Sequence, residues 1–332
     1  GVLACALFAA VSGSSPATVV AIGSILMPAM VKAGFPKGFG AGVITTSGAL
    51  GILIPPSIVM VMYSVSTNTS VGALFMAGVV PGLLLAFFLG LTTWYRAKKN
   101  NYPCQPKATW GERWVALRKA IWGLLLIVVV MGGIYTGIFT PTEAAAMSAV
   151  YAFVVAVFVY KDMGLKDVPR VLLSSANMSA MLLYIITNAV LFSFLLTHEN
   201  IPQQMADQMI GTGIGVIGFL LISNVLLLIA GNFMEPSSIV LILAPILFPI
   251  AIKLGIDPVH FGIIMVVNME VGMCHPPVGL NLYVASGITK MGITELTVAV
   301  WPWLLTMLGF LVMVTYWPGL SLWLPRVMGL VT

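Results

Sequence analysis

The sequence predicts an all-α, polytopic membrane protein made of two inverted-topology repeats, each with a re-entrant helical hairpin and a broken transmembrane helix. Three observations lead to this fold class. The chain is 60% hydrophobic and only 8% charged, whereas soluble domains carry about 25% charged residues. Its apolar runs have the length of bilayer-spanning helices. Polar or proline-rich breaks interrupt some of these runs, and non-helical backbone at membrane depth survives only where protein or a water-filled cavity satisfies it.

The composition also argues against several classes of protein. The net charge of +5 comes from basic residues in short loops between apolar runs. This pattern sets membrane topology and is no signal for nucleic-acid binding. The three cysteines have neither metal-ligand nor disulfide spacing. Because the chain starts at Gly1 within an apolar run, without Met or a basic flank, we expect its N-terminus to be truncated.

The first repeat is expected over residues 1–95. Two apolar arms flank a polar turn at residues 12–16, and each arm is too short for a comfortable crossing, so residues 1–33 are predicted to form a re-entrant hairpin. Residues 38–64 are long enough to cross but contain two adjacent prolines, which remove backbone donors and unwind the helix. A further span is predicted over 81–95.

A basic loop and a set of scaffold spans separate the two repeats. Residues 96–119 are rich in Lys and Arg, so the positive-inside rule places this loop in the cytoplasm. Glu143, which closely follows Thr140, is expected to stabilise the start of a helix. The spans of the scaffold region, residues 120–212, are predicted at 120–139, 143–160 and 171–196.

The second repeat, residues 213–325, has the same parts in the same order. A hairpin is predicted over 214–252, with a polar tip at residues 231–238. The broken helix that follows, 258–286, is interrupted by a His-Pro-Pro sequence. A final span is expected over 301–318.

Sliding the first repeat along the chain aligns it with the second without a gap. Pro55 falls on Pro276, a shift of 221 positions, and Gly51 falls on Gly272 at the same shift. The other matched prolines are Pro28 with Pro249, Pro56 with Pro277 and Pro81 with Pro302. Because an odd number of predicted crossings separates the two hairpin bases, the bases lie on opposite faces of the membrane and the repeats are inverted.

The breaks predict a binding chemistry. A broken helix leaves N–H groups free at the start of one half-helix and carbonyl groups free at the end of the other. The N-terminal ends favour a carboxylate, and the carbonyl ends suit a cation such as Na⁺. Paired broken helices in inverted repeats are typical of secondary transporters with a site at the membrane midplane. The alternative is a pair of proline-kinked structural helices in another kind of membrane protein.

Two side chains at the second tip and break carry further hypotheses. A charge near the bilayer centre costs about 2.5–3.5 kcal/mol on insertion scales. Glu235 is therefore expected to coordinate a substrate or a cation, to cap the return arm of its hairpin, or to do both. His275 could act as a ligand, as a switch or as a hydrogen-bond partner of the freed carbonyl groups, and the last role is favoured.

These residues resemble those of a known family. The motifs that carry the resemblance are Ser12-Gly13-Ser14, Ile54-Pro55-Pro56-Ser57, Met234-Glu235, Gly255-Ile256-Asp257-Pro258 and Pro276-Pro277-Val278-Gly279. Essentially the whole chain is similar to the large membrane subunit of tripartite ATP-independent periplasmic (TRAP) transporters, of the DctM type. The motif of the second half is specific.

The resemblance implies a subunit of an elevator-type secondary transporter in the bacterial cytoplasmic (inner) membrane, driven by Na⁺ and without enzymatic activity. A soluble periplasmic substrate-binding protein of the DctP type would deliver the substrate. A small membrane subunit of the DctQ type would brace the scaffold within the lipid bilayer. The two hairpins and the two broken helices would form the moving transport domain.

The resemblance also implies site residues by position. Sodium sites would use backbone near Ser12, Gly51, Ile54 and Pro56, and near Asn232, Gly272, His275 and Pro277. The substrate would meet Ser14, Ser57, Glu235 and His198.

The chain departs from the family pattern at three of these positions. Family members often have Asp where this chain has Glu235 and Thr where it has His275, and the sialic-acid transporters have Arg near the position of His198. The missing Arg disfavours sialate. The second half is closer to the C4-dicarboxylate branch, so a succinate-, malate- or fumarate-like anion is favoured, with sialic acid or another carboxylate as the alternative.

Two classes of protein other than transporters are weighed as alternatives. An intramembrane enzyme is disfavoured because the chain has no His-Glu-x-x-His sequence and no Ser/His/Asp set on adjacent spans. An ion channel is disfavoured because inverted hairpins within one chain point to alternating access.

Overall fold

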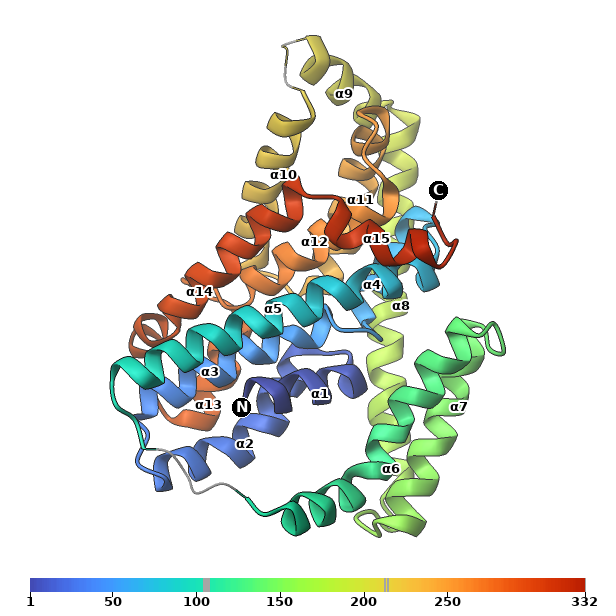
Figure 1. The fold of residues 1–332 in the computed structure, drawn as a ribbon. Coiled ribbons are helices and arrows are strands. Elements are labelled where there is room, and N and C mark those ends of the chain that lie inside the picture. The colour runs from blue at the N-terminus through green and yellow to red at the C-terminus, as the bar shows by residue number, and fades with distance from the viewer. Residues whose placement is uncertain (104–107, 212, 214, 332) are drawn as a thin grey trace. The chain divides into compact units, whose positions relative to one another are not determined.

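The computed structural model describes residues 1–103, 108–211, 213 and 215–331, and every regular element in these ranges is a helix (Figure 1). The chain divides into two compact units, one of Gly1–Gln105 with Phe192–Thr332 and the other of Pro106–Leu191. Within the described ranges, seven helices are long and apolar enough to cross a membrane. This confirms the prediction of an all-α, polytopic membrane protein. Part of the predicted basic loop, residues 104–107, lies outside the described residues.

The first part of the larger unit contains both the predicted tip and the predicted break. Its elements are α1 (Val2–Ser12), α2 (Ser15–Lys32), α3 (Lys37–Gly48), the 3₁₀ turn η1 (Ala49–Ile52), α4 (Ile58–Thr67) and α5 (Val71–Lys99). Gly13 connects α1 to α2 in a left-handed conformation with φ 60°, which favours glycine. The cis-linked Pro55 and Pro56 lie between η1 and α4, where the break was predicted.

The second part of the larger unit is likewise a series of helices interrupted by a proline break. After the end of α8 (Val168–His198), it consists of α9 (Ile201–Gly211), α10 (Val216–Gly231), α11 (Pro236–Lys253), α12 (Pro258–Gly272), α13 (Leu280–Thr289), α14 (Ile293–Tyr316) and α15 (Gly319–Val327). Asp257 starts α12 by accepting hydrogen bonds from the backbone N–H groups of Val259 (2.8 Å) and His260 (3.2 Å). The cis-linked Pro276 and Pro277 separate α12 from α13.

The smaller unit is built from long helices with mostly exposed apolar side chains. It contains α6 (Trp110–Tyr135), α7 (Pro141–Val154), the π turn η2 (Val155–Val159) and most of α8. Thr140 and Glu143 form a capping box at the start of α7, which confirms the helix-start role expected for this carboxylate. The Tyr151 hydroxyl donates to the Trp122 carbonyl oxygen at 2.7 Å and so ties α7 to α6.

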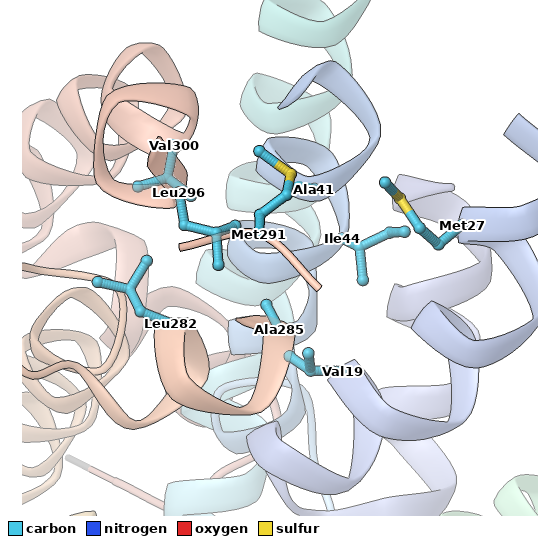
Figure 2. Close-up of a cluster of buried hydrophobic side chains, with 9 residues drawn as sticks. All are labelled: Val19, Met27, Ala41, Ile44, Leu282, Ala285, Met291, Leu296 and Val300. Atoms are coloured by element: carbon cyan, nitrogen blue, oxygen red, sulfur yellow. The ribbon is translucent and has the colours of Figure 1, made fainter. Parts of the chain in front are cut away.

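A buried apolar cluster joins the two parts of the larger unit (Figure 2). It draws side chains from α2 and α3 on one side, and from α13, α14 and the link between them on the other. Its members are Val19, Met27, Ala41, Ile44, Leu282, Ala285, Met291, Leu296 and Val300. The two parts are also joined by hydrogen bonds from the Tyr63 hydroxyl to the Pro258 carbonyl oxygen (2.8 Å) and from Trp303 Nε1 to Thr93 Oγ1 (2.9 Å). They therefore share one core.

Several predicted boundaries were wrong at prolines and in the basic loop. Helices α5 and α14 begin well before the predicted spans, so Pro81 and Pro302 lie inside helices instead of near a span start. Proline is tolerated there because neighbouring groups in a packed membrane protein can satisfy the freed carbonyl group. The predicted loop 96–119 is helical at both ends, and α15 was not predicted at all.

The two return arms are longer than the sequence indicated. Helices α2 and α11 have 18 residues each, and both are among the helices that could cross a membrane by length and composition. The re-entrant character of the two helix pairs stays a prediction.

Candidate functional site

The tip between α1 and α2 lies directly against the break between η1 and α4, and we call this region the first site (Ser12–Ser15 with Gly51–Ser57). The Ile58 N–H donates to the Gly13 carbonyl oxygen at 3.4 Å. A Cβ added to Gly51 would lie 2.6 Å from the Ser14 carbonyl oxygen. Because the obstacle is backbone, no side chain can move aside, and the close approach requires glycine.

Hydroxyl and carbonyl groups line the tip of the first site. Ser12 Oγ donates to the Ser14 carbonyl oxygen at 3.2 Å and lies 2.8 Å from Thr18 Oγ1. Thr18 Oγ1 in turn donates to the Ser14 carbonyl oxygen at 2.8 Å. The tip therefore presents only neutral oxygen atoms and the N-terminal end of α2.

Ser57 joins the two halves of the first broken helix. Its Oγ donates to the Ile52 carbonyl oxygen at 2.6 Å and accepts a hydrogen bond from the Met60 N–H at 3.4 Å. The side chain is buried and caps α4. Ile54 and Pro56 form the non-helical connection between these groups.

In the second site (Gly231–Ser238 with Gly272–Gly279) a tip and a break also lie directly against each other. A Cβ added to Gly272 would lie 2.8 Å from the Gly231 Cα atom. The Gly279 N–H donates to the Asn232 carbonyl oxygen at 3.2 Å, across the break that contains Pro277. His275 Nδ1 lies 3.2 Å from Asn232 Oδ1, so the structure gives this ring a side-chain partner in place of a freed carbonyl group.

Glu235 is the charged side chain of the second site. It caps α11 by accepting hydrogen bonds from the Ser238 N–H (3.0 Å), Ser238 Oγ (3.3 Å) and Ser237 Oγ (2.9 Å). The residue is nevertheless exposed. The capping role is therefore present, and the carboxylate remains open to a ligand.

The structure does not bring His198 together with the other predicted residues. This residue ends α8, is exposed, and stacks its ring on Phe194 of the same helix at a centroid distance of 6.1 Å. Among the described residues, no hydrogen bond or ion pair joins its side chain to either tip.

One residue that the sequence analysis missed connects the two sites. Asn281, in the first turn of α13, donates from Nδ2 to Ser15 Oγ at 2.7 Å and to the Thr45 carbonyl oxygen at 3.4 Å. It therefore links the second break to the first tip. Its signal in the sequence is an amide residue placed directly after a break, at the start of a half-helix.

Helix ends of both polarities meet in this part of the molecule. Helices α2, α4, α11 and α13 start at the tips and breaks, and α1, η1, α10 and α12 end there. Helix starts carry positive partial charge and attract anions, whereas helix ends carry negative partial charge and attract cations. The arrangement can thus bind a carboxylate and cations at neighbouring positions.

Comparisons with known proteins identify the family of this chain. Residues 1–320 match the family described as "Tripartite ATP-independent periplasmic transporter, DctM component". The C4-dicarboxylate TRAP transporter large permease protein DctM of Rhodobacter capsulatus is 74% identical over 99% of this chain and 78% of its own length. Its counterpart from Pseudomonas aeruginosa is 56% identical over 99% and 77%, respectively. An isethionate TRAP transporter permease protein, DctMQ, from Oleidesulfovibrio alaskensis is 43% identical over 96% of this chain and 50% of its own length. The chain therefore belongs to the DctM family and is a large permease subunit of a TRAP transporter.

Proposed function

We propose that this permease carries a small organic anion, most readily a C4-dicarboxylate, across the bacterial inner membrane in symport with Na⁺. A periplasmic binding protein of the DctP type delivers the anion, and a small membrane subunit of the DctQ type completes the membrane complex. The geometric observation that carries the proposal is the pair of helix breaks, each pressed at a glycine against a helical tip. The C4-dicarboxylate cargo of the two most similar relatives described above supports the choice of anion.

The chemistry of the two sites supports an anionic substrate. Four helix starts surround them, and the polar side chains Ser14, Ser57 and Glu235 lie at three of those starts. Free N–H groups at a helix start bind carboxylates, and a dicarboxylate has one carboxylate group at each end. Glu235 would repel this substrate unless a cation lies between them, so its charge argues for coupled binding. His198, which no hydrogen bond or ion pair joins to either tip among the described residues, would meet the substrate only after a conformational change.

The donor atoms at the breaks fit a hard cation such as Na⁺. Carbonyl groups end η1 and α12, and the side-chain oxygen atoms of Ser12 and Asn232 lie at the neighbouring tips. Neutral oxygen atoms of this kind are the ligands that hard cations prefer. The ions would be held near Ser12, Gly51, Ile54 and Pro56, and near Asn232, Gly272, His275 and Pro277, and they would supply positive charge for the substrate carboxylates.

The matching of the two sites supports an elevator built on inverted repeats. Gly51 and Gly272, related by the same shift as the prolines, make the same kind of contact with their respective tips. In this proposal the two helix pairs and the two broken helices move as one transport domain. The helices of the smaller unit form the scaffold, and their exposed apolar side chains face lipid or the small subunit.

Uptake into proteoliposomes tests the proposal. The full-length permease, its small subunit and its binding protein are reconstituted, and labelled succinate is offered with and without an inward Na⁺ gradient. We expect uptake that saturates and requires both the gradient and the binding protein, and we expect no uptake of labelled sialate. Uptake of succinate without a Na⁺ gradient would refute the coupling, and uptake of sialate alone would refute the substrate.

A further inference from the structure

Glu270 is an acidic residue that none of the roles above uses. It lies in the last turn of α12 and is 0% exposed. All ten Asp and Glu residues of the chain fall within the described ranges, and Glu270 is the one among them that is buried. Its carboxyl group therefore lies in the packed interior of the larger unit.

Both oxygen atoms of this carboxyl group lack a protein partner. Within the part of the chain that the structure describes, neither Oε1 nor Oε2 of Glu270 accepts a hydrogen bond, and no ion pair involves this residue. An unpaired carboxylate in a low-dielectric interior is very costly, and buried charges in proteins are paired or coordinate metals. If the carboxyl group is ionised, this position needs a positively charged partner that is not a side chain.

Glu270 lies on the opposite face of α12 from the contact between Gly272 and Gly231. Two residues along a helix correspond to a rotation of about 200°, so Glu270 points away from the face where Gly272 meets Gly231. Cys274 follows Glu270 by four residues, the spacing that places side chains on the same side of a helix, and it is buried as well. Cys274 Sγ donates to the Thr45 carbonyl oxygen at 3.5 Å.

Asn281 contacts Cys274 through its amide nitrogen and carries a second unsatisfied oxygen atom. Its Nδ2 lies 3.7 Å from Cys274 Sγ and donates to Ser15 Oγ and to the Thr45 carbonyl oxygen. Because a carbonyl oxygen can only accept, this contact fixes which end of the amide faces Thr45. The buried Oδ1 of Asn281 is left without a donor.

We propose that Glu270 and Asn281 form a buried binding site for a monovalent hard cation, Na⁺ in this transporter, beside Cys274 and apart from the ion positions at the tips. The donors are oxygen atoms with a single negative charge, which balances one positive charge. A divalent ion usually draws on more carboxylates than this site offers. The end of α12 adds the negative partial charge of its carbonyl groups. Through Asn281 and Ser15, the bound ion holds the second break to the first tip.

The identity of the ion rests on the proposed Na⁺ coupling, but the site can be tested by binding alone. The permease in complex with its small subunit is purified, choline chloride replaces NaCl at constant ionic strength, and bound radioactive sodium is counted per complex. We expect Glu270→Gln to bind one Na⁺ fewer than the wild type. The matched control is Glu295→Gln, which neutralises an exposed carboxylate in the first turn of α14 and should leave the count unchanged.

Thermal unfolding provides the second readout. In choline chloride, Glu270→Gln should unfold at a higher temperature than the wild type, because the unpaired buried charge is gone. Added NaCl should raise the unfolding temperature of the wild type more than that of the variant. An unchanged sodium count and an equal response to NaCl would overturn the site and indicate a carboxyl group that carries a proton.

A second variant covers the case in which Glu270→Gln does not fold. Asn281→Ala removes the neutral oxygen ligand and keeps the carboxylate, so we expect one Na⁺ to bind at least tenfold more weakly. Unchanged sodium affinity in that variant would overturn the site. If wild-type uptake proves independent of Na⁺ while Glu270→Gln still loses one bound ion, the proposed coupling fails and the site stands.

Discussion

The first and second sites each place a helical tip against a proline break, but they differ in their side chains. In both, a helical tip touches a glycine in the last turn before a proline break, at Gly51 and at Gly272. The first site is lined by neutral groups that bond among themselves, such as Ser12 with Thr18. The second carries a charged side chain, Glu235, and an imidazole paired with an amide.

This difference separates what the fold requires from what recognition requires. The contact between tip and break is made of backbone atoms, so it tolerates any side chain nearby but no Cβ at the glycine. Charge is confined to the second site, where Glu235 is exposed and can meet a ligand. We infer that the shared backbone positions the helix ends and that the second site distinguishes among ligands.

The largest expected effect comes from adding one methyl group at either contact. In Gly51→Ala the new Cβ would lie 2.6 Å from the Ser14 carbonyl oxygen, and in Gly272→Ala it would lie 2.8 Å from the Gly231 Cα atom. Overpacking of this kind costs about 1–3 kcal/mol or more, and here backbone must shift. We expect both variants to lose uptake and to unfold at clearly lower temperatures.

Two other glycines provide the control for this pair. A Cβ on Gly90 of α5 or on Gly309 of α14 would meet no atom within 4 Å. Alanine at these positions should be neutral or slightly stabilising, since alanine favours helix more than glycine does by about 1 kcal/mol. If Gly51→Ala impaired the protein and Gly272→Ala did not, the two contacts would not be equivalent.

The next effect isolates the charge of the second site. Glu235→Gln keeps most of the size and capping ability of the side chain but removes its charge, so we expect folded protein with uptake reduced at least about tenfold, which corresponds to about 1.4 kcal/mol. Uptake and the unfolding temperature are measured on the same preparation. Glu295→Gln again serves as the control, and Glu235→Asp should retain activity. Near-normal uptake in Glu235→Gln would leave Glu235 as a helix cap only.

The sequence was sufficient to predict the helix breaks because their causes are local. Adjacent prolines end a helix wherever they occur, and the breaks at Pro55 and Pro276 were found where the sequence placed them. A single proline led to a wrong helix boundary at Pro81, because whether a helix continues through a proline depends on neighbouring groups that the sequence does not reveal. The interruption at residues 12–16 was predicted from a polar, glycine-containing segment, and the structure turns the chain there at Gly13.

The candidate site was only partly predictable because its contacts join distant segments. Asn281 reaches Ser15 across most of the chain, and no local pattern indicates that pairing. Glu270 could have been noticed, since an acidic residue within an apolar run is rare and usually functional. Its complete burial, however, depends on packing from several helices. The exposed position of His198 likewise could not be read from its spacing.

The smallest effect tests whether the imidazole–amide pair of the second site acts as a unit. His275→Ala and Asn232→Ala each remove one partner of a partly buried hydrogen bond (3.2 Å), for which we expect a loss of about 0.5–1.5 kcal/mol. In a double-mutant cycle the two losses should not add, because the second substitution removes a bond that the first has already broken. The matched cycle in the first site uses Ser12→Ala and Thr18→Ala, whose hydroxyl groups lie 2.8 Å apart. Coupling between His275 and Asn232, together with Na⁺-dependent coupling between Ser12 and Thr18, would assign ion binding to the neutral first site. Additive losses at His275 and Asn232 would show that this pair contributes nothing specific.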